Sequence, residues 1–303
     1  MLVRATISSG GVALFKRITA KNIRDTKNLE EKLPVVTAYD AAMAGLAEKA
    51  GCDVLLVGDS LGMVVLGYES TIPVVMDDMV HHTKAVVRGS QKAHVVSDMP
   101  FMSFNVSVED TLRNASRLIQ EGGAQSVKLE GGKPISGQVK RLVASGIPVM
   151  GHIGLTPQSI LNVGGYKIQG KIKTEALRLL EDAKILEEMG AYSIVLELIP
   201  APLAKLITEE VTIPTIGIGA GPFCDGQVQV FHDLMGLYPK FIPKHTRQYL
   251  NLGVKIEKAL RTYLAEVKNG KFPSDPESFS MDSEVFERFS NKWNFYESHN
   301  ENS

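Results

Sequence analysis

The sequence predicts an α/β protein built as a single closed (β/α)8 barrel, the TIM barrel, and three observations support this. Short apolar segments alternate with segments of helical periodicity, which is typical of a parallel sheet. The alternation fills most of the 303 residues without a linker, so one barrel is favoured over two domains. The alternative, an open Rossmann-like sheet, is disfavoured because the first strand–helix turn lacks a GxGxxG motif.

The first half of the chain contains strands predicted at residues 33–38, 54–57, 94–98 and 126–130. Their runs of valine and leucine indicate buried parallel strands. The helices predicted between them cover residues 41–50, 77–88 and 107–122. The first helix is rich in alanine. The second has acids in its first turn and Arg88 in its last, and the third opens with the N-cap Ser107 and ends at Gly122.

The second half continues the alternation less regularly. The predicted strands cover residues 147–152, 193–197 and 213–221, with an eighth somewhere in residues 234–243. One helix ends near Gly146, an amphipathic helix covers 174–189, and further helices cover 201–209 and 251–268. A long glycine-rich loop, 154–170, follows the fifth strand. Beyond Pro273 polar residues dominate, so residues 274–303 are predicted to be a loosely held tail.

Composition limits the classes of partner. Hydrophobic residues make up 44% and charged residues 22% of the chain, as in soluble globular proteins. The net charge of -1 gives no basic field for a nucleic acid, and no apolar run is long enough to cross a membrane. Cys52 and Cys224 lie outside any CxxC pattern, which argues against a disulfide framework or a zinc ribbon. We therefore expect a protein of a reducing compartment, the cytoplasm.

The N-terminal segment allows a second location. Residues 1–24 carry several basic residues and no acid before Asp25. This composition is compatible with a mitochondrial transit peptide, and equally with a start segment that leads into a helix near residues 19–30. Both interpretations stay open.

Ionisable or hydroxyl residues follow the ends of successive predicted strands. They are Asp40, Asp59 with Ser60, Asp98, Lys128 with Glu130, His152, and Glu197. Each acid alone is more often a turn residue than a ligand, but the carboxyl ends of barrel strands converge on one face. Unpaired charges there are costly, so a divalent cation is expected to neutralise them. Oxygen ligands without a His/Cys cluster favour Mg²⁺ or Mn²⁺ over zinc.

Two further features have alternative interpretations. His152 is either a zinc ligand or a hydrogen-bond donor to a substrate, and the second is favoured because no other histidine is close in sequence. His81 and His82 are expected on a helix surface and receive no role. The glycine cluster 217–221 suits either a loop that closes over an anion or a tight turn.

Several motifs together resemble the ketopantoate hydroxymethyltransferase family, from about Ile18 to Phe279. They are VGDSLGM (57–63), DMPFM (98–102), VKLEGG (127–132), GHIGLTPQS (151–159), GGYKIQG (164–170) and IGIGAG (216–221). Each motif is short, but their order and spacing are specific to the family. The resemblance divides the chain into an N-terminal extension (1–17), a catalytic barrel (18–279) and a C-terminal tail (280–303).

The resemblance implies a (β/α)8 enzyme that forms homodecamers of two pentameric rings. Such enzymes make 2-dehydropantoate from 3-methyl-2-oxobutanoate and 5,10-methylenetetrahydrofolate, in pantothenate and coenzyme A biosynthesis. It implies that Asp59 and Asp98 hold Mg²⁺, with Glu130 as the third carboxylate of the metal site. The residues implied to contact the 2-oxo acid are Asp59, Ser60, Asp98 and Lys128. Glu197 matches the family's proton acceptor, and His152 is a weaker candidate.

These assignments fit the chemistry. The C3 proton of the oxo acid is weakly acidic, and Mg²⁺ on the 2-oxo and carboxylate groups stabilises the enolate that forms when the proton leaves. Lys128 adds a positive charge near the enolate, and Glu197, at a different strand end, can act as the base. No motif specifies contacts to the folate.

The chain departs from the family in three places. His245 and Thr246 stand where relatives more often have Phe and Val, residues 281–303 extend past the usual family end, and the segment before Ile18 lies outside the resemblance. Two other functions remain as alternatives. A Mg²⁺-dependent 2-oxo acid carbon–carbon lyase of the isocitrate lyase or phosphonomutase type would place a Cys on a mobile loop, and none is evident here. A non-catalytic binding protein would have lost a carboxylate, and all are present.

Overall fold

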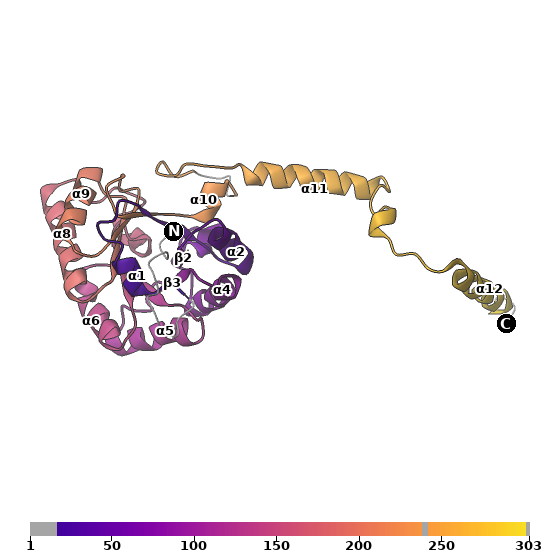
Figure 1. Cartoon of the computed structure of the whole chain (residues 1–303), viewed down its shortest axis with the longest axis horizontal. Coiled ribbons are helices and arrows are strands. Elements are labelled where there is room, and N and C mark those ends of the chain that lie inside the picture. The colour runs from indigo at the N-terminus through magenta and orange to yellow at the C-terminus, as the bar shows by residue number, and fades with distance from the viewer. Residues whose placement is uncertain (1–16, 238–241, 301–303) are drawn as a thin grey trace, which may run out of the picture. The chain divides into compact units, whose positions relative to one another are not determined.

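The computed structural model describes residues 17–237 and 242–300. Its contacts divide the chain into two units, residues 1–250 and residues 251–303. The first unit contains a closed barrel of parallel strands in sequential order, with helices around it (Figure 1). The predicted (β/α)8 fold is confirmed.

The barrel strands are Leu33–Thr37 (β1), Val54–Val57 (β2), His94–Asp98 (β3), Ser126–Glu130 (β4), Val149–Gly154 (β5), Ser193–Glu197 (β6), Thr215–Ile218 (β7) and Gly226–Gln229 (β8). The barrel closes because β1 pairs with both β2 and β8. The position predicted for the eighth strand, 234–243, is wrong. β8 is short and carries two glutamines instead of an apolar run, so it has no hydrophobic signature. Gly226 is needed there because a Cβ would lie 2.5 Å from the Leu33 carbonyl oxygen.

The helices of the first unit are Ala20–Arg24 (α1), Ala41–Lys49 (α2), Leu61–Val64 (α3), Met76–Gly89 (α4), Val108–Gln120 (α5), Ser136–Ala144 (α6), Ile160–Val163 (α7), Lys173–Glu188 (α8), Ala201–Glu210 (α9) and Phe231–Met235 (α10). The longer ones follow the predicted bounds within a few residues. Polar caps fix two of their starts: Asp40 accepts from the Met43 N–H at 2.7 Å, and Ser107 accepts from the Asp110 N–H at 3.0 Å. The helix expected near residues 19–30 is only the short α1.

The inside of the barrel is apolar around the middle of β3, β5 and β6 and ionisable near their ends. Side chains of a strand alternate between its two faces, so residues two apart share a face. Val96, Met150 and Val195 belong to one buried apolar cluster. The residues two positions further along line the cavity described below: Asp98, His152 and Glu197. The register of these three strands therefore places packing and chemistry in successive layers.

A buried polar cluster lies among the first residues of β3, β4 and β6. His94 contacts the Ile18 carbonyl oxygen through Nδ1 at 2.9 Å and the Ser126 hydroxyl through Nε2 at 2.8 Å. The Tyr192 hydroxyl bonds to Ser126 at 2.9 Å. Burial lowers the pKa of His94 from 6.5 to about 4. The ring is therefore neutral, with Nδ1–H donating to Ile18.

We expect the stability of the protein to fall in mild acid because of His94. Between pH 6.5 and 4 the unfolded chain binds this proton and the folded chain does not, so lowering the pH favours unfolding. The contribution is about 2 kcal/mol by pH 5. Urea unfolding of the wild type and of His94→Asn, whose amide can still donate to Ile18, measures it. An equal change between pH 7 and pH 5 in both proteins would contradict the assignment.

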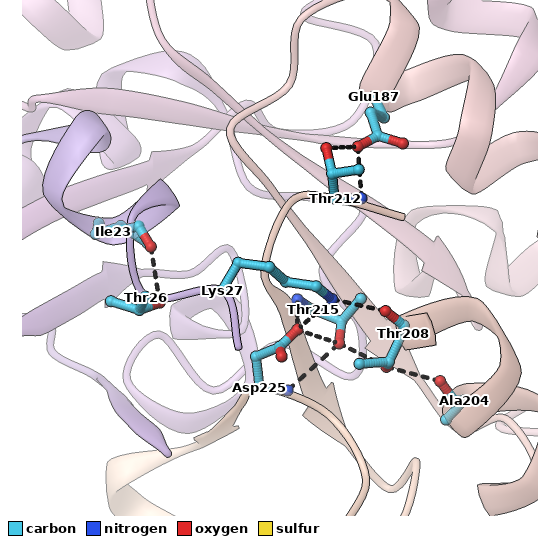
Figure 2. Close-up of polar contacts among 9 residues, drawn as sticks. All are labelled: Ile23, Thr26, Lys27, Glu187, Ala204, Thr208, Thr212, Thr215 and Asp225. Atoms are coloured by element: carbon cyan, nitrogen blue, oxygen red, sulfur yellow. Dashed lines mark hydrogen bonds and ion pairs between the residues drawn. The ribbon is translucent and has the colours of Figure 1, made fainter. Parts of the chain in front are cut away.

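A second polar network joins the segment after α1 to β7, β8 and α9 (Figure 2). The Lys27 ammonium donates to the Thr208 carbonyl oxygen at 2.6 Å and to Asp225 Oδ2 at 3.0 Å. Asp225 also accepts from the Thr215 N–H at 2.8 Å. The Lys27 and Asp225 side chains are each only 10% exposed. Lys27 thus ties the N-terminal segment to the barrel by a nearly buried ion pair.

Replacing Lys27 by methionine is expected to cost about 3 kcal/mol, since Asp225 would keep its charge without its cation. Lys21→Met is the control, because Lys21 pairs with Asp25 in the open, and it should cost less than about 0.5 kcal/mol. Urea midpoints of both variants test this. Equal midpoints would mean that the Lys27 pair contributes nothing.

The second unit contains the helices Leu252–Lys268 (α11) and Ser283–Asn300 (α12). The predicted helix 251–268 is confirmed. Part of the tail predicted for 274–303 is helical, with apolar residues at helical spacing that are all exposed: Val285, Phe286, Phe289 and Trp293. That the tail is loosely held stays a prediction. The unit also begins at residue 251, whereas the sequence analysis carries the barrel to 279.

Residues 1–16, which hold most of the candidate transit peptide, lie outside the described residues, so that interpretation stays a prediction. Among the described helices, none has the length and hydropathy needed to span a bilayer.

Candidate active site

A cavity of about 670 Å³ opens at the carboxyl ends of the strands. The predicted site residues that line it are Asp59, Ser60, Asp98, Lys128, Glu130, His152 and Glu197. Asp40 is not among them, and its carboxylate instead caps α2. The sequence prediction that strand-end groups converge is therefore confirmed for all but one of its residues.

Lys128 lies among the acids. Its Nζ is 3.1 Å from Asp98 Oδ1 and 4.0 Å from Glu130 Oε1, and its side chain is 4% exposed. Burial acts to lower the pKa of this ammonium, but the charges of Asp98, Glu130 and Asp59 raise it above its ordinary value. Lys128 therefore stays charged and is the main positive group of the cavity floor.

Asp59 and Asp98 are not fully neutralised by this cation. Asp98 Oδ2 accepts from the Asp59 N–H at 3.0 Å, which ties the Asp98 carboxylate to the backbone of Asp59. Burial and the charges of Asp98 and Glu130 raise the pKa of Asp59 well above its usual range, and burial raises that of Asp98. Asp98 Oδ1 is buried and makes no hydrogen bond, although it faces the Lys128 charge. An additional cation would stabilise both acids.

The acids of the cavity floor have the ligand chemistry that Mg²⁺ prefers, but they do not form a preformed metal site. Within residues 17–237 and 242–300, no three His, Cys, Asp or Glu side chains are arranged around one metal position. Asp59 and Asp98 offer the hard oxygen ligands that Mg²⁺ prefers. The oxygens of Glu130 are occupied, since Oε2 accepts from the Gln158 N–H at 3.0 Å and Oε1 lies 3.5 Å from His152. The other two acids are engaged as well, since Asp59 Oδ2 accepts from Gln158 and the Asp98 oxygens face Lys128 and the Asp59 N–H.

His152 connects this floor to Glu197. Its Nδ1 is 3.1 Å from Lys128 Nζ, and its Nε2 is 3.2 Å from Glu197 Oε2. Burial and the Lys128 charge act to lower the pKa of His152, whereas Glu130 and Glu197 raise it to about 9. With this raised pKa the ring is protonated at neutral pH, so Nε2–H faces Glu197 and Nδ1–H faces Glu130 Oε1, 3.5 Å away. In this state His152 carries positive charge between the two carboxylates and orients that of Glu197.

Glu197 approaches the cavity from the opposite wall. It ends β6, which lies across the ring from β2, the strand that precedes Asp59. Its side chain is 14% exposed, more than those of the floor acids. A small molecule bound at Asp59 and Asp98 would therefore have Glu197 on its far side.

Gln158 is a site residue that the sequence analysis missed. It lies in the short helix Pro157–Ser159 and is buried. Its side-chain amide donates to Asp59 Oδ2 at 2.8 Å and to the Met99 carbonyl oxygen at 2.9 Å. With its own N–H on Glu130, Gln158 fixes two acids at once. It lies within the GHIGLTPQS motif, which was the only signal available, because a search for ionisable strand ends passes over glutamine.

The outer walls of the cavity are mostly apolar. They include Met63, Tyr166, Ile168, Leu198 and Pro243. The glycine cluster 217–221 forms a tight turn beside them, with Gly219 at φ +65° and a Cβ there only 2.6 Å from Leu198 Cδ2. An anion-binding role for this loop stays a prediction.

His245 and Thr246, which depart from the family pattern, both have defined contacts or positions after β8. His245 lines the cavity beside Gly219. Thr246 donates from its hydroxyl to Gln229 Oε1 at 3.0 Å. Polar contacts thus replace the apolar packing expected of Phe and Val.

Comparisons with known proteins identify the relatives of this chain. A family model described as ketopantoate hydroxymethyltransferase matches residues 17–275. The 3-methyl-2-oxobutanoate hydroxymethyltransferase of Syntrophus aciditrophicus is 57% identical over 264 residues, 87% of this chain and 97% of that protein. The protein of the same name from Carboxydothermus hydrogenoformans is 56% identical over 272 residues, 90% of this chain and 99% of that protein.

Solved structures share the fold at low identity. A putative phosphonomutase from Burkholderia cenocepacia has a TM-score of 0.56 at 14% identity and covers 83% of this chain and 100% of its own. A 2,3-dimethylmalate lyase of the PEP mutase/isocitrate lyase superfamily has a TM-score of 0.51 at 12% identity, over 94% and 99% of the two chains. These likenesses support the barrel architecture.

Proposed function

The chain belongs to the ketopantoate hydroxymethyltransferase family of enzymes, and on that premise we propose its reaction. It transfers a hydroxymethyl group from 5,10-methylenetetrahydrofolate to 3-methyl-2-oxobutanoate, giving 2-dehydropantoate for pantothenate and coenzyme A biosynthesis. One observation carries the proposal: acids that need a further cation form the cavity floor, and a separate acid, Glu197, faces them from the opposite wall.

The floor is suited to a 2-oxo acid. Such a substrate is an anion, and Asp59, Asp98 and Glu130 would repel it unless a cation lay between. We propose that Asp59 and Asp98 hold Mg²⁺ and that Glu130 is the third carboxylate of the metal site. Mg²⁺, when bound, supplies the positive charge that stabilises an enolate.

Lys128 and Ser60 orient the acid from the protein side. The Lys128 ammonium is held in place by Asp98 at 3.1 Å and adds positive charge where negative charge develops. The Ser60 hydroxyl bonds to the Tyr39 hydroxyl at 2.8 Å, which fixes its direction. Both groups contact the substrate in the proposed complex.

Glu197 takes the proton. The C3–H bond breaks, the proton moves to a Glu197 oxygen, and the electron pair of that bond forms the enolate double bond. His152 holds the carboxylate through Nε2 at 3.2 Å. The enolate carbon then forms a bond to the one-carbon unit, both C–N bonds that hold this unit to the folate break, and tetrahydrofolate leaves. One water is consumed overall: its OH becomes the new hydroxyl, and its other proton and the C3 proton end on the two folate nitrogens.

The test is an assay of the purified full chain. We expect Mg²⁺, 3-methyl-2-oxobutanoate and methylenetetrahydrofolate to give ketopantoate by mass spectrometry, and we expect EDTA to abolish it until Mg²⁺ is restored. Without the folate, the chain should exchange the C3 proton with deuterium. Exchange without product would mean a wrong one-carbon donor. Neither exchange nor product would favour the lyase or the non-catalytic barrel.

The assembly expected from the resemblance, a homodecamer, stays a prediction. Sedimentation velocity of the full chain tests it directly, and a monomer at micromolar concentration would contradict it.

A further inference from the structure

The cavity is larger than the oxo acid requires. At about 670 Å³ it has the size of sites that take drug-sized ligands. The acids, Lys128 and His152 account for its floor. The remaining space lies between apolar walls that include Tyr166, Ile168 and Pro243, and one further acid, Asp233, reaches it from α10. This acid has no role in the proton transfer described above.

The position of Asp233 is set by contacts at the mouth of the barrel. The Phe231 N–H donates to the Thr37 hydroxyl at 3.0 Å and fixes the start of α10 against the end of β1. The His232 ring packs on Tyr39 at 5.5 Å between centroids. The Tyr39 hydroxyl in turn bonds to Ser60, a proposed contact of the oxo acid. The start of α10 is therefore linked to the oxo acid site through Tyr39. Asp233 is thus anchored beside that site but not in it.

Asp233 differs from the floor acids in its lack of partners. Within the part of the chain that the structure describes, its carboxylate makes no hydrogen bond and no ion pair, while Asp98 and Glu130 each have a cation nearby. The residue is half-buried, and this burial raises its pKa to about 6. A ligand that brings N–H donors would relieve the cost of this desolvated carboxylate.

We propose that Asp233 binds the pterin ring of the one-carbon donor, accepting hydrogen bonds from the ring N3–H and the 2-amino group. This inference rests on the proposed function. The two donors lie side by side in the ring plane and match the two oxygens of one carboxylate. The flat faces of the ring suit the apolar residues that line the same cavity as Asp233. The oxo acid cannot be the partner, because it is an anion without N–H donors.

The experiment compares two donors on two proteins. The donors are methylenetetrahydrofolate and its 2-desamino analogue, and the proteins are the wild type and Asp233→Asn. For the natural donor, we expect the variant to raise KM about 10- to 100-fold with kcat changed less than about threefold. KM for the oxo acid and the folate-independent C3 exchange should not change. Asp77→Asn, an exposed acid paired with Arg117, is the control.

The analogue isolates the hydrogen bond. The wild type should lose about 10- to 100-fold in kcat/KM on losing the 2-amino group, whereas the variant should lose much less, because its partner is already gone. The comparison of the two donors on the wild type remains a test even if the variant does not fold. Equal losses in both proteins, or a wild type indifferent to the analogue, would overturn the assignment. A fall in kcat at unchanged KM would do so too, since it would make Asp233 a proton donor.

The failure of the proposed function gives a different result. A wild type that exchanges the C3 proton but gives no product with the natural donor overturns the folate reaction and this inference together. If the wild type gives product and Asp233→Asn has a normal KM for the natural donor, the inference alone is overturned.

Discussion

Replacing Glu197 by glutamine is expected to reduce turnover by about 10³-fold or more, because the proposed acceptor of the C3 proton loses its basicity. The amide keeps the size of the side chain and can still accept from His152 Nε2, which lies 3.2 Å away. The floor residues are untouched, so KM for the oxo acid should change little. The same loss should appear in C3 deuterium exchange, which needs no folate.

The matching control is Glu188→Gln on the exposed face of α8. It should leave both rates within about twofold. Near-normal exchange in Glu197→Gln would remove Glu197 from the role of base. Normal exchange with slow product formation would instead move its role to the later carbon–carbon step.

Replacing Lys128 by methionine is expected to affect both stability and activity. Asp98 and Glu130 would remain buried without their ammonium, which costs about 3–5 kcal/mol. The loss of a fixed positive charge beside the developing enolate should lower C3 exchange by about 10²- to 10³-fold. Because the floor would then carry one positive charge fewer, added Mg²⁺ should raise the melting temperature of the variant more than that of the wild type.

Thermal unfolding with and without Mg²⁺ measures this difference. Lys184→Met serves as the control, since Lys184 pairs with Glu210 at the surface with about half of its side chain exposed. It should change stability by less than about 0.5 kcal/mol and should not alter the response to Mg²⁺. An identical Mg²⁺ response in the Lys128 variant and the wild type would separate Lys128 from the metal site.

The fold and the floor of the site could be predicted because both depend on local signals. Apolar strands that end in an ionisable residue are visible in one sequence, and parallel pairing brings those ends together. Asp40 has the same appearance but caps a helix, and only the structure separates the two uses of a carboxylate after a strand.

The missed residues are those whose role depends on contacts distant in sequence. Gln158 bonds to Asp59 across 99 positions, and nothing local marks an uncharged amide for that role. Asp233 was missed because the eighth strand was predicted at the wrong position. A strand at 234–243 would place Asp233 before it, at the wrong end of the barrel, whereas the true β8 ends at Gln229 and puts Asp233 at the mouth.

The layered register of the strands has a consequence for how this protein can change. Val96 and Asp98 are only two positions apart, yet one supports the fold and the other the chemistry. Variation confined to cavity-lining strand ends such as Glu197, whose side chain is 14% exposed, should therefore yield libraries rich in folded members. The same variation introduced two positions earlier should yield mostly insoluble protein. Two neighbouring side chains on one face of the same strand thus differ in how much substitution the fold tolerates at them.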